Sequence, residues 1–199
     1  MKGLLLKDFY VLTGQMKFFL ILMLVFAVVP GASMSAFAVV YAAMLPYTTL
    51  AYDERSKWDV LAGMLPYTTR DMVLSKYVLG YLATGGALLV TALGKLILPF
   101  SGNRESLAAL LPVFAVALLL LAVTLPFMFR FGVEKGRMVF VMIMAFAAVG
   151  TNLLMQSMLE SPKAYAALPA LSLWFPLVAV AANLLSIGIS LGLYAKREH

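Results

Sequence analysis

Charged residues are rare along this chain and lie in groups, with long and almost entirely apolar stretches between the groups. A helix needs about 20 apolar residues to cross the roughly 30 Å hydrocarbon core of a bilayer. The uncharged stretch 18–52 is too long for one crossing, and the Pro-Gly-Ala-Ser segment 30–33 divides it. The pattern therefore predicts six transmembrane helices, at residues 18–30, 34–52, 78–99, 107–129, 138–155 and 171–194. We expect Pro46 to kink the second of them, because proline removes a backbone hydrogen bond.

Basic residues lie mostly on one side of the predicted spans. Six spans place both termini on the same side, and that side carries 12 of the 15 Lys and Arg residues, namely Lys2, Lys7, Lys17, Arg55, Lys57, Arg70, Lys76, Arg130, Lys135, Arg137, Lys196 and Arg197. The other side carries Lys95, Arg104 and Lys163. Because basic loops stay in the cytosol, we expect both termini to be cytosolic. The chain is then a single transmembrane domain, 1–199, in the plasma membrane.

Residues 1–17 precede the first span and form a separate segment. Leu5, Phe9, Leu12 and Met16 recur at helical spacing, which predicts a helix lying in the membrane interface. The alternative is an extension of the first span whose lysines reach the headgroups. A cleavable signal peptide is disfavoured, because the segment before the apolar run is too long and too helical for the charged region of such a peptide.

The predicted cytosolic loop 52–77 holds charges of both signs and one apolar face. Its charged residues are Asp53, Glu54, Arg55, Lys57, Asp59, Arg70, Asp71 and Lys76. One face of a short helix combines Trp58, Leu61, Ala62 and Leu65, and Pro66 is expected to end that helix. Thr69 is the expected N-cap of a second helix that continues into the third span. A short amphipathic helix suits docking into a groove on a soluble partner. A solvated connector whose Trp58 anchors at the headgroups is the alternative.

Composition excludes most soluble classes of protein. Hydrophobic residues make up 63% of the 199 residues and charged residues 12%, against about 45–50% and about 25% in soluble domains. The net charge of +6 belongs to the inner loops and does not indicate nucleic acid. With no Cys and a single histidine, His199, we expect no disulfide, metal or cofactor site. Gly94-Lys95 is followed by Leu96, so it is not a phosphate-binding loop and the chain is not expected to hydrolyse ATP.

The predicted spans carry no Asp or Glu. Ion-coupled transporters usually need an acidic group at mid-membrane, so we expect the energy for any transport to come from a partner. The polar residues that do fall in spans include Thr84, Thr91, Asn152, Gln156, Asn183, Ser186 and Ser190. Gly188 and Gly192 form a small-xxx-small pair that permits close packing against another helix.

The loop also carries a resemblance to a known family. Its sequence reads Tyr52-Asp53-Glu54-Arg55-Ser56-Lys57-Trp58-Asp59, then Leu65-Pro66, then Arg70 and Ser75-Lys76-Tyr77. This resembles the "DEkskWd … LP … R … sKy" signature that follows the second span of ABC-2 type permeases. The opening Met1-Lys2-Gly3-Leu4 with Lys7-Asp8 is similar to their N-terminal interface helix. Tyr67-Thr68-Thr69 departs from the pattern, because a shorter link before the arginine is expected there.

The resemblance is closest to small six-span permeases such as the membrane subunits of phenol-soluble modulin exporters of bacteria. It implies an all-α, type V ABC exporter-like fold with an N-terminal interface helix and a cytosolic coupling helix. It further implies that two permeases form the pore, as a homodimer or with a paralogue, and that a separate ABC ATPase binds ATP and Mg²⁺. The residues expected to couple the permease to that ATPase are Asp53, Glu54, Arg55, Lys57, Trp58, Asp59, Leu61, Leu65, Pro66, Arg70 and Lys76.

We therefore expect a permease subunit of an ATP-driven exporter in a bacterial cell membrane. Its Met-rich, uncharged interior suits amphipathic peptides or other lipophilic compounds and offers no fixed charge for ions or sugars. The second hypothesis is a membrane scaffold or sensor that transports nothing and recruits a cytosolic partner through the same loop.

Overall fold

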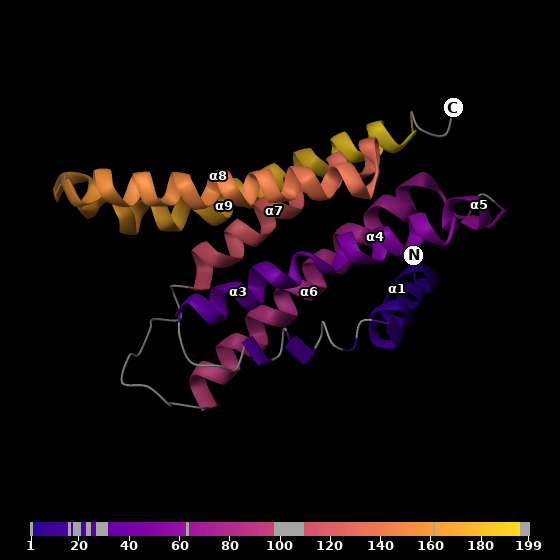
Figure 1. The fold of residues 1–199 in the computed structure, drawn as a ribbon, viewed down its shortest axis with the longest axis horizontal. Coiled ribbons are helices and arrows are strands. Elements are labelled where there is room, and N and C mark those ends of the chain that lie inside the picture. Colours follow the sequence, from indigo (N-terminus) through magenta and orange to yellow (C-terminus); the bar gives the residue numbers. More distant parts are fainter. Residues whose placement is uncertain are drawn as a thin grey trace.

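The computed structural model describes residues 2–15, 17, 21–22, 25–26, 32–62, 64–97, 110–160 and 162–195, and within the helices the side chains at 15, 32–35, 59, 95–97, 147–148, 151–173 and 195 are left undescribed. The described chain is helical and contains no strand, as the apolar pattern predicts. The helices are α1 Lys2–Gln15, α3 Ala32–Ala42, α4 Leu45–Arg55, α5 Trp58–Ala62, α6 Thr69–Ile97, α7 Leu110–Phe131, α8 Val133–Glu160 and α9 Pro162–Ala195 (Figure 1). Most of the first predicted span, 18–30, lies outside the described residues.

Among the described residues, three helical segments are long and apolar enough to cross a membrane: Thr69–Gly94, Leu110–Phe131 and Trp174–Tyr194. They correspond to the third, fourth and sixth predicted spans, and α8 contains the fifth. The third begins earlier than the span predicted from its apolar residues alone, because α6 runs without interruption from the loop into the membrane segment. The total of six spans stays a prediction.

The second predicted span is divided at Pro46. Helix α3 ends at Ala42, and a turn separates it from α4, in which Pro46 occupies the first turn. The Met44 N–H donates to the Tyr41 carbonyl over 3.0 Å within this turn. Proline is well tolerated at the start of a helix, where its missing N–H would have no partner in any case. The outcome is two short helices in place of the single kinked helix that we predicted.

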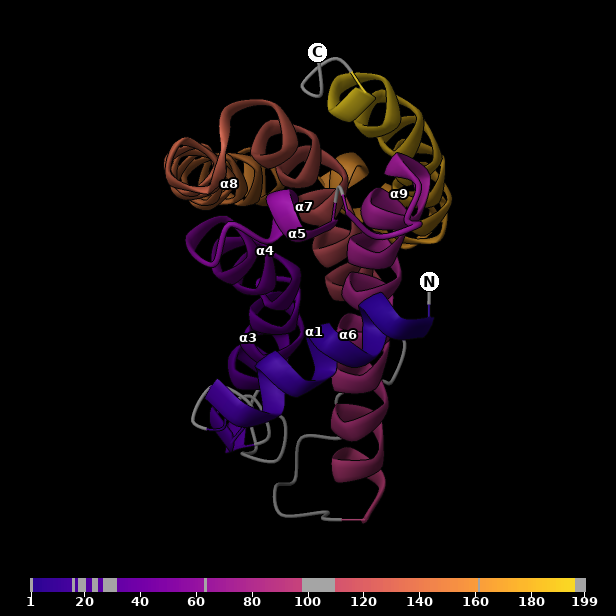
Figure 2. The ribbon, with the colours of Figure 1, turned by 90° about the vertical axis from the view of Figure 1, so that its right-hand side faces the viewer.

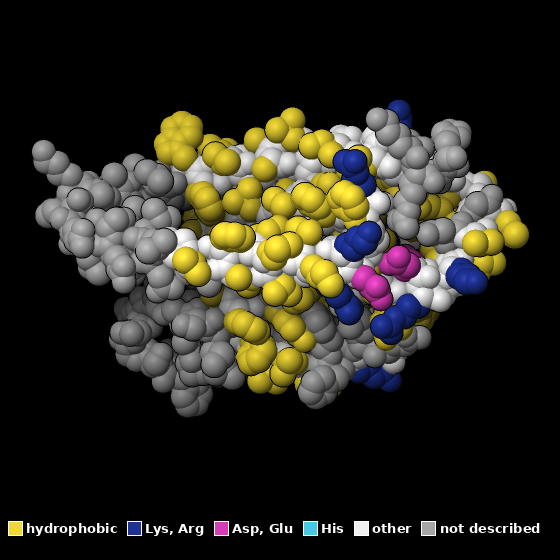
Figure 3. All heavy atoms as spheres, turned by 45° about the horizontal axis from the view of Figure 1, so that its top comes forward, with side chains coloured by type: hydrophobic (Ala, Val, Ile, Leu, Met, Phe, Trp, Pro, Cys, Tyr) yellow, Lys and Arg dark blue, Asp and Glu magenta, His cyan; other side chains and the backbone are white. Residues whose placement is uncertain are grey.

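The helices are arranged so that α5, the junction of α7 with α8, and the end of α9 gather at one end of the molecule (Figures 1 and 2). One face of the surface shows hydrophobic side chains over its middle, while Lys, Arg, Asp and Glu side chains gather toward that same end (Figure 3). We call it the charged end. This separation places the predicted cytosolic loop and the predicted apolar spans in different parts of the fold.

Helix α7 lies at the centre, and polar side chains join it to its neighbours. Tyr77 of α6 shares hydrogen bonds of 2.6 Å with Ser186 and 2.8 Å with Ser190 of α9. Asn183 of α9 donates to the Leu118 carbonyl of α7 over 2.9 Å. Apolar surroundings supply no hydrogen-bond partners, so polar groups in membrane helices find theirs on neighbouring helices. We call the contacts of these residues the polar seam, and it joins α6, α7 and α9.

The glycine pair of α9 faces outward. A Cβ placed on Gly188 or on Gly192 would meet no atom within 4 Å. Neither glycine therefore supports close helix packing inside the described part of this chain. Packing against another chain stays a prediction.

Candidate functional site

Helix α1 turns one face toward α4 and α6, and an aspartate lies in the middle of that face. Leu4, Asp8 and Leu12 are spaced one helical turn apart, and all three are buried. Phe9, which the predicted interface stripe includes, is 58% exposed. The buried stripe shares Leu12 with the predicted interface stripe and excludes Phe9, because it accommodates a charge that has partners in α4 and α6. Placement of α1 in the membrane interface stays a prediction.

Those partners form a compact cluster of four charges, Lys7, Asp8, Asp53 and Lys76, which we call the charge cluster. The Lys76 ammonium lies 2.8 Å from an Asp8 carboxylate oxygen and 2.6 Å from one of Asp53. The Lys7 ammonium lies 2.6 Å from Asp53 and 3.2 Å from Asp8. Each carboxylate thus contacts both lysines, and the cluster has no net charge.

Burial makes this arrangement energetically necessary. Asp8 is 1% exposed, Lys76 5% and Asp53 7%. Moving one such ion out of water costs several kcal/mol, and only close pairing with good geometry offsets that cost. Lys76 also donates to the Thr49 hydroxyl over 3.4 Å. The charge cluster therefore holds the start of the chain, the end of α4 and the first turns of α6 in one fixed arrangement.

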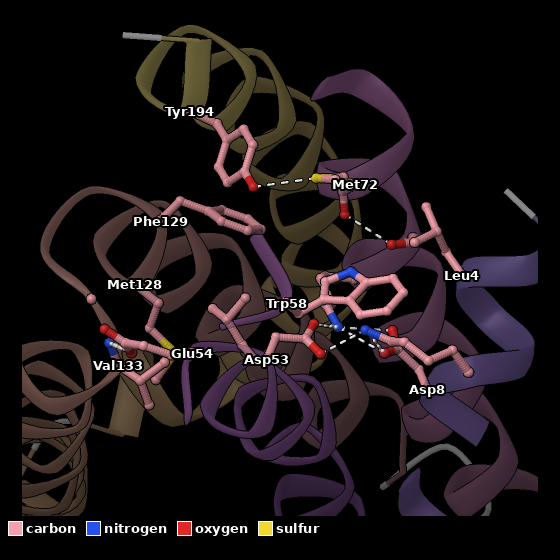
Figure 4. Close-up of a pocket in the computed structure, with 15 residues that line it drawn as sticks. Leu4, Asp8, Asp53, Glu54, Trp58, Met72, Met128, Phe129, Val133 and Tyr194 are labelled. Atoms are coloured by element: carbon pink, nitrogen blue, oxygen red, sulfur yellow. Dashed lines mark hydrogen bonds and ion pairs between the residues drawn. The ribbon is translucent and has the colours of Figure 1, made fainter. Parts of the chain in front are cut away.

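Trp58 closes the charge cluster on the side of α5. The Lys7 ammonium lies 4.3 Å from the centre of the Trp58 ring, a cation–π contact (Figure 4). Lys57, just before α5, adopts a φ of 52°, which is uncommon for a residue with a side chain. This left-handed residue reverses the chain between α4 and α5, so that the indole turns back over the cluster.

The same turn of α4 also reaches the start of α8. The Val133 N–H donates to a Glu54 carboxylate oxygen over 2.9 Å. Gly132, just before α8, has a φ of 84°, and a Cβ there would lie 2.9 Å from the other Glu54 oxygen. Glycine thus serves twice at this junction, because it adopts the left-handed conformation and leaves room for the carboxylate.

A pocket of about 40 Å³ opens beside these groups. Leu4, Met72, Phe129 and Tyr194 supply part of its apolar wall, and the charge cluster, Glu54 and Trp58 supply the polar part (Figure 4). Small-molecule sites enclose roughly 300–1,000 Å³. The pocket is too small to hold a cargo molecule, so the site is suited to holding helices together at the charged end.

The predicted apolar face of the loop helix is divided between two directions. Trp58 and the buried Ala62 point inward, whereas Leu61 is 54% and Leu65 43% exposed. The reason is the short length of α5, which ends at Ala62 before the predicted stop at Pro66. The exposed apolar side chains of this region, which we call the outer apolar patch, are Val60, Leu61, Met64 and Leu65.

The N-cap of α6 is Thr68 and not the predicted Thr69. The Asp71 N–H donates to the Thr68 hydroxyl over 3.2 Å, and the Asp71 carboxylate accepts from that hydroxyl over 2.9 Å and from the Thr68 N–H over 3.5 Å. This is a reciprocal capping box. The sequence contains two adjacent threonines, and Asp71 selects the one that lies three positions before it.

The remaining predicted coupling residues are exposed, or their side chains lie outside the described residues. Arg55, Lys57, Pro66 and Arg70 are exposed at the charged end, and the Asp59 side chain lies outside the described residues. Residues that the sequence reasoning did not single out for this site are Lys7, Asp8, Thr49, Thr68 and Gly132. The position of Asp8, midway between Leu4 and Leu12 on a helical face, is the one signal in the sequence that indicates a buried acid.

Comparison with known proteins identifies the family. Residues 3–195 match the family model described as ABC-2 family transporter protein. The comparisons with curated proteins and with solved structures gave no match. The matched region contains α1 except its first residue, the charge cluster, α5 and the three segments that can cross a membrane. The chain therefore belongs to the ABC-2 family and is an integral membrane protein of a transporter.

Proposed function

We propose that this chain is the permease subunit of an ATP-driven exporter, and that a separate ABC ATPase docks on the outer apolar patch. One observation carries the proposal: Val60, Leu61, Met64 and Leu65 are 43–78% exposed at the charged end, outside the three candidate spans. Exposed apolar groups next to polar surroundings are typical of protein interfaces. Trp58 contacts Lys7 of the charge cluster and Ala62 is buried, so the other side of α5 is held and a partner on the patch would have a firm surface to bind.

The partner is proposed to supply the energy. The sequence has no phosphate-binding loop, so ATP and Mg²⁺ would bind in the ATPase. Exposed Arg55, Lys57 and Arg70 would form a charged rim around the apolar contact, which is the usual composition of such interfaces. Movement of the ATPase during its cycle would then displace α5 and the helices that the charge cluster holds.

The proposal includes six spans with cytosolic termini, and a second permease copy or a paralogue. The gathering of α5, the α7–α8 junction and the end of α9 at one end supports the even number of crossings (Figure 1). The outward Gly188 and Gly192 would allow the second permease to approach α9 closely. The proposed cargo is an amphipathic peptide or another lipophilic compound, because the chain has 13 Met and its predicted spans contain no Asp or Glu.

Co-purification with the ATPase tests the docking. Leu61→Asp combined with Leu65→Asp should weaken the complex by about 30-fold or more, since truncating a central apolar anchor typically costs about 2 kcal/mol or more. Ser56→Asn, at an exposed polar position of the same loop, adds no charge to the rim; it is the matched control and should bind normally. Trp58→Ala is a poor test, because the ring contacts Lys7 within the chain. Undiminished binding of the double variant would refute docking on the patch.

Vesicle transport distinguishes the exporter from the scaffold or sensor. Reconstituted with its ATPase, the chain should accumulate an amphipathic peptide when ATP is present, and an uncoupler should not abolish this. The predicted spans lack an acid that could accept a proton for coupling. ATPase binding without any ATP-dependent accumulation would favour the scaffold, and accumulation driven by a pH gradient alone would exclude the proposed mechanism.

A further inference from the structure

Two adjacent acids at the end of α4 point in different directions. Asp53 contacts the lysines of α1 and α6, whereas Glu54 reaches the beginning of α8 (Figure 4). The backbone joins this turn directly to α5. The Ser56 N–H donates to the Tyr52 carbonyl over 2.9 Å, and the Lys57 N–H donates to the Glu54 carbonyl over 3.3 Å. A displacement of α5 therefore acts on the turn that carries Glu54.

The contact of Glu54 with α8 has the chemistry of a helix cap supplied by another helix. The first N–H groups of a helix have no partner within it, and the positive end of the helix dipole favours a carboxylate there. Glu54 accepts from the Val133 N–H, and its second oxygen lies beside Gly132. The two bonded residues are 79 positions apart in sequence. The carboxylate thus stabilises α8 only as long as α4 keeps its position.

The junction between α7 and α8 is packed tightly enough to pass on such a force. The Gly132 N–H donates to the Met128 carbonyl over 3.0 Å, and the Gly136 N–H donates to the Gly132 carbonyl over 3.1 Å. A Cβ on Gly136 would overlap the Met128 side chain. With so little free space, the first turn of α8 follows the group that caps it. Helix α8 has 28 residues, so it extends the effect over about 40 Å.

We infer that Glu54 is a positioning residue that passes displacement of α5 to α8, by capping α8 from the last turn of α4. The inference rests on the proposed function only for the source of the displacement, which is the docked ATPase. It also changes the role expected for Glu54 from a contact with the ATPase to a contact within the permease. Asp53, the residue before it, instead contacts Lys7 of α1 and Lys76 of α6.

Hydrogen exchange of segment 132–136 in the isolated, detergent-solubilised chain tests the cap itself. Glu54→Ala should raise exchange there by roughly 2- to 30-fold, the range that corresponds to loss of an N-cap. Glu54→Gln should raise it less, because the amide oxygen still accepts a hydrogen bond. Arg55→Ala, at the exposed charged residue next to Glu54 in the last turn of α4, is the matched control. Unchanged exchange in Glu54→Ala would overturn the inference.

A double-mutant cycle tests the transmission. Trp58→Ala removes the contact that seats α5 on Lys7 and should raise exchange of 132–136 by about 2- to 5-fold, the worth of a cation–π contact. The effect should disappear when Glu54 is already alanine and should persist beside Arg55→Ala. Persistence in the Glu54→Ala background would overturn the inference. No ATPase takes part in this experiment, so a failed docking test would count against the proposed function and leave this result standing.

Discussion

Replacing Lys76 by methionine is expected to destabilise the protein more than any other single change in the charge cluster. The substitution keeps most of the side-chain volume but leaves Asp8 and Asp53 beside Lys7 alone. Asp8 is 1% exposed, and its remaining contact with the Lys7 ammonium is 3.2 Å long. Removing one partner of a buried ion pair costs about 3–5 kcal/mol. We expect a loss of that size in the free energy of unfolding.

Lys7→Met is the matched comparison. The Lys7 side chain is 21% exposed, against 6% for Lys76. After Lys7→Met, water can therefore reach part of the site from which the Lys7 ammonium contacts the two carboxylates. Its loss removes the 2.6 Å contact with Asp53 and the cation–π contact with Trp58. An exposed ion pair contributes about 0–1 kcal/mol, so this partly buried pair is expected at or above the upper end of that range, and a cation–π contact contributes about 0.5–1 kcal/mol. We expect a loss of about 1–2 kcal/mol, well below that of Lys76→Met.

The double variant Asp8→Asn with Lys76→Met separates pairing from packing. It leaves Lys7 and Asp53 as one neutral pair, 2.6 Å apart. Because no unpaired charge then stays buried, its loss should be smaller than the sum of the two single losses by about 2 kcal/mol or more. Denaturant titration in detergent, followed by tryptophan fluorescence and circular dichroism, measures the wild type, the three single variants and the double variant. Additive losses, or a Lys76→Met loss below that of Lys7→Met, would refute the account of the cluster.

Three further predictions concern topology and helix ends. The chain has no Cys, so single cysteines can be introduced at Ser56 and at Lys163. An impermeant thiol reagent added outside intact cells should label the cysteine at 163 and not the one at 56. The opposite pattern would contradict cytosolic termini. Gly132→Ala should destabilise by about 1–3 kcal/mol, because alanine at a φ of 84° is strained and its Cβ would crowd a carboxylate oxygen of α4; unchanged thermal unfolding would argue against that geometry. Thr68→Ala should lower the free energy of unfolding by about 0.5–2 kcal/mol, because it removes the N-cap of α6. Thr69→Ala should lower it clearly less in the same assay, and equal losses would argue against Thr68 as the N-cap.

The sequence predicted the helical elements well where charges mark their ends. The third, fourth and sixth predicted spans correspond to helical segments that can cross a membrane. A run of about 20 apolar residues between charged groups is most often a membrane-spanning helix. The break at Pro46 was harder to predict, because a proline within an apolar run can either kink one helix or begin a new helix. Which one forms depends on the packing of α3 and α4 against α6 and α7.

The site was harder to predict than the fold, because its contacts join distant parts of the sequence. Lys76 and Asp8 are 68 residues apart, and nothing in the pattern of either segment specifies the other. The inward turn of Trp58 depends on the left-handed conformation of Lys57 and on the short length of α5. The prediction that Trp58 and Leu65 share one face required a helix that continues to Leu65, whereas α5 ends at Ala62.

The separation between Asp8 and Lys76 also has a consequence for the order in which the protein assembles during synthesis. Helix α1 leaves the ribosome before α4 and α6, and the lysine that makes burial of its aspartate tolerable is made 68 residues after that aspartate. Until then, an aspartate in the apolar site beside α4 would lack half of its compensation. We therefore expect α1 to wait in a hydrated position, with Asp8 toward water, while the next two spans insert. Helix α1 would then reach its final place later than helices that are translated after it.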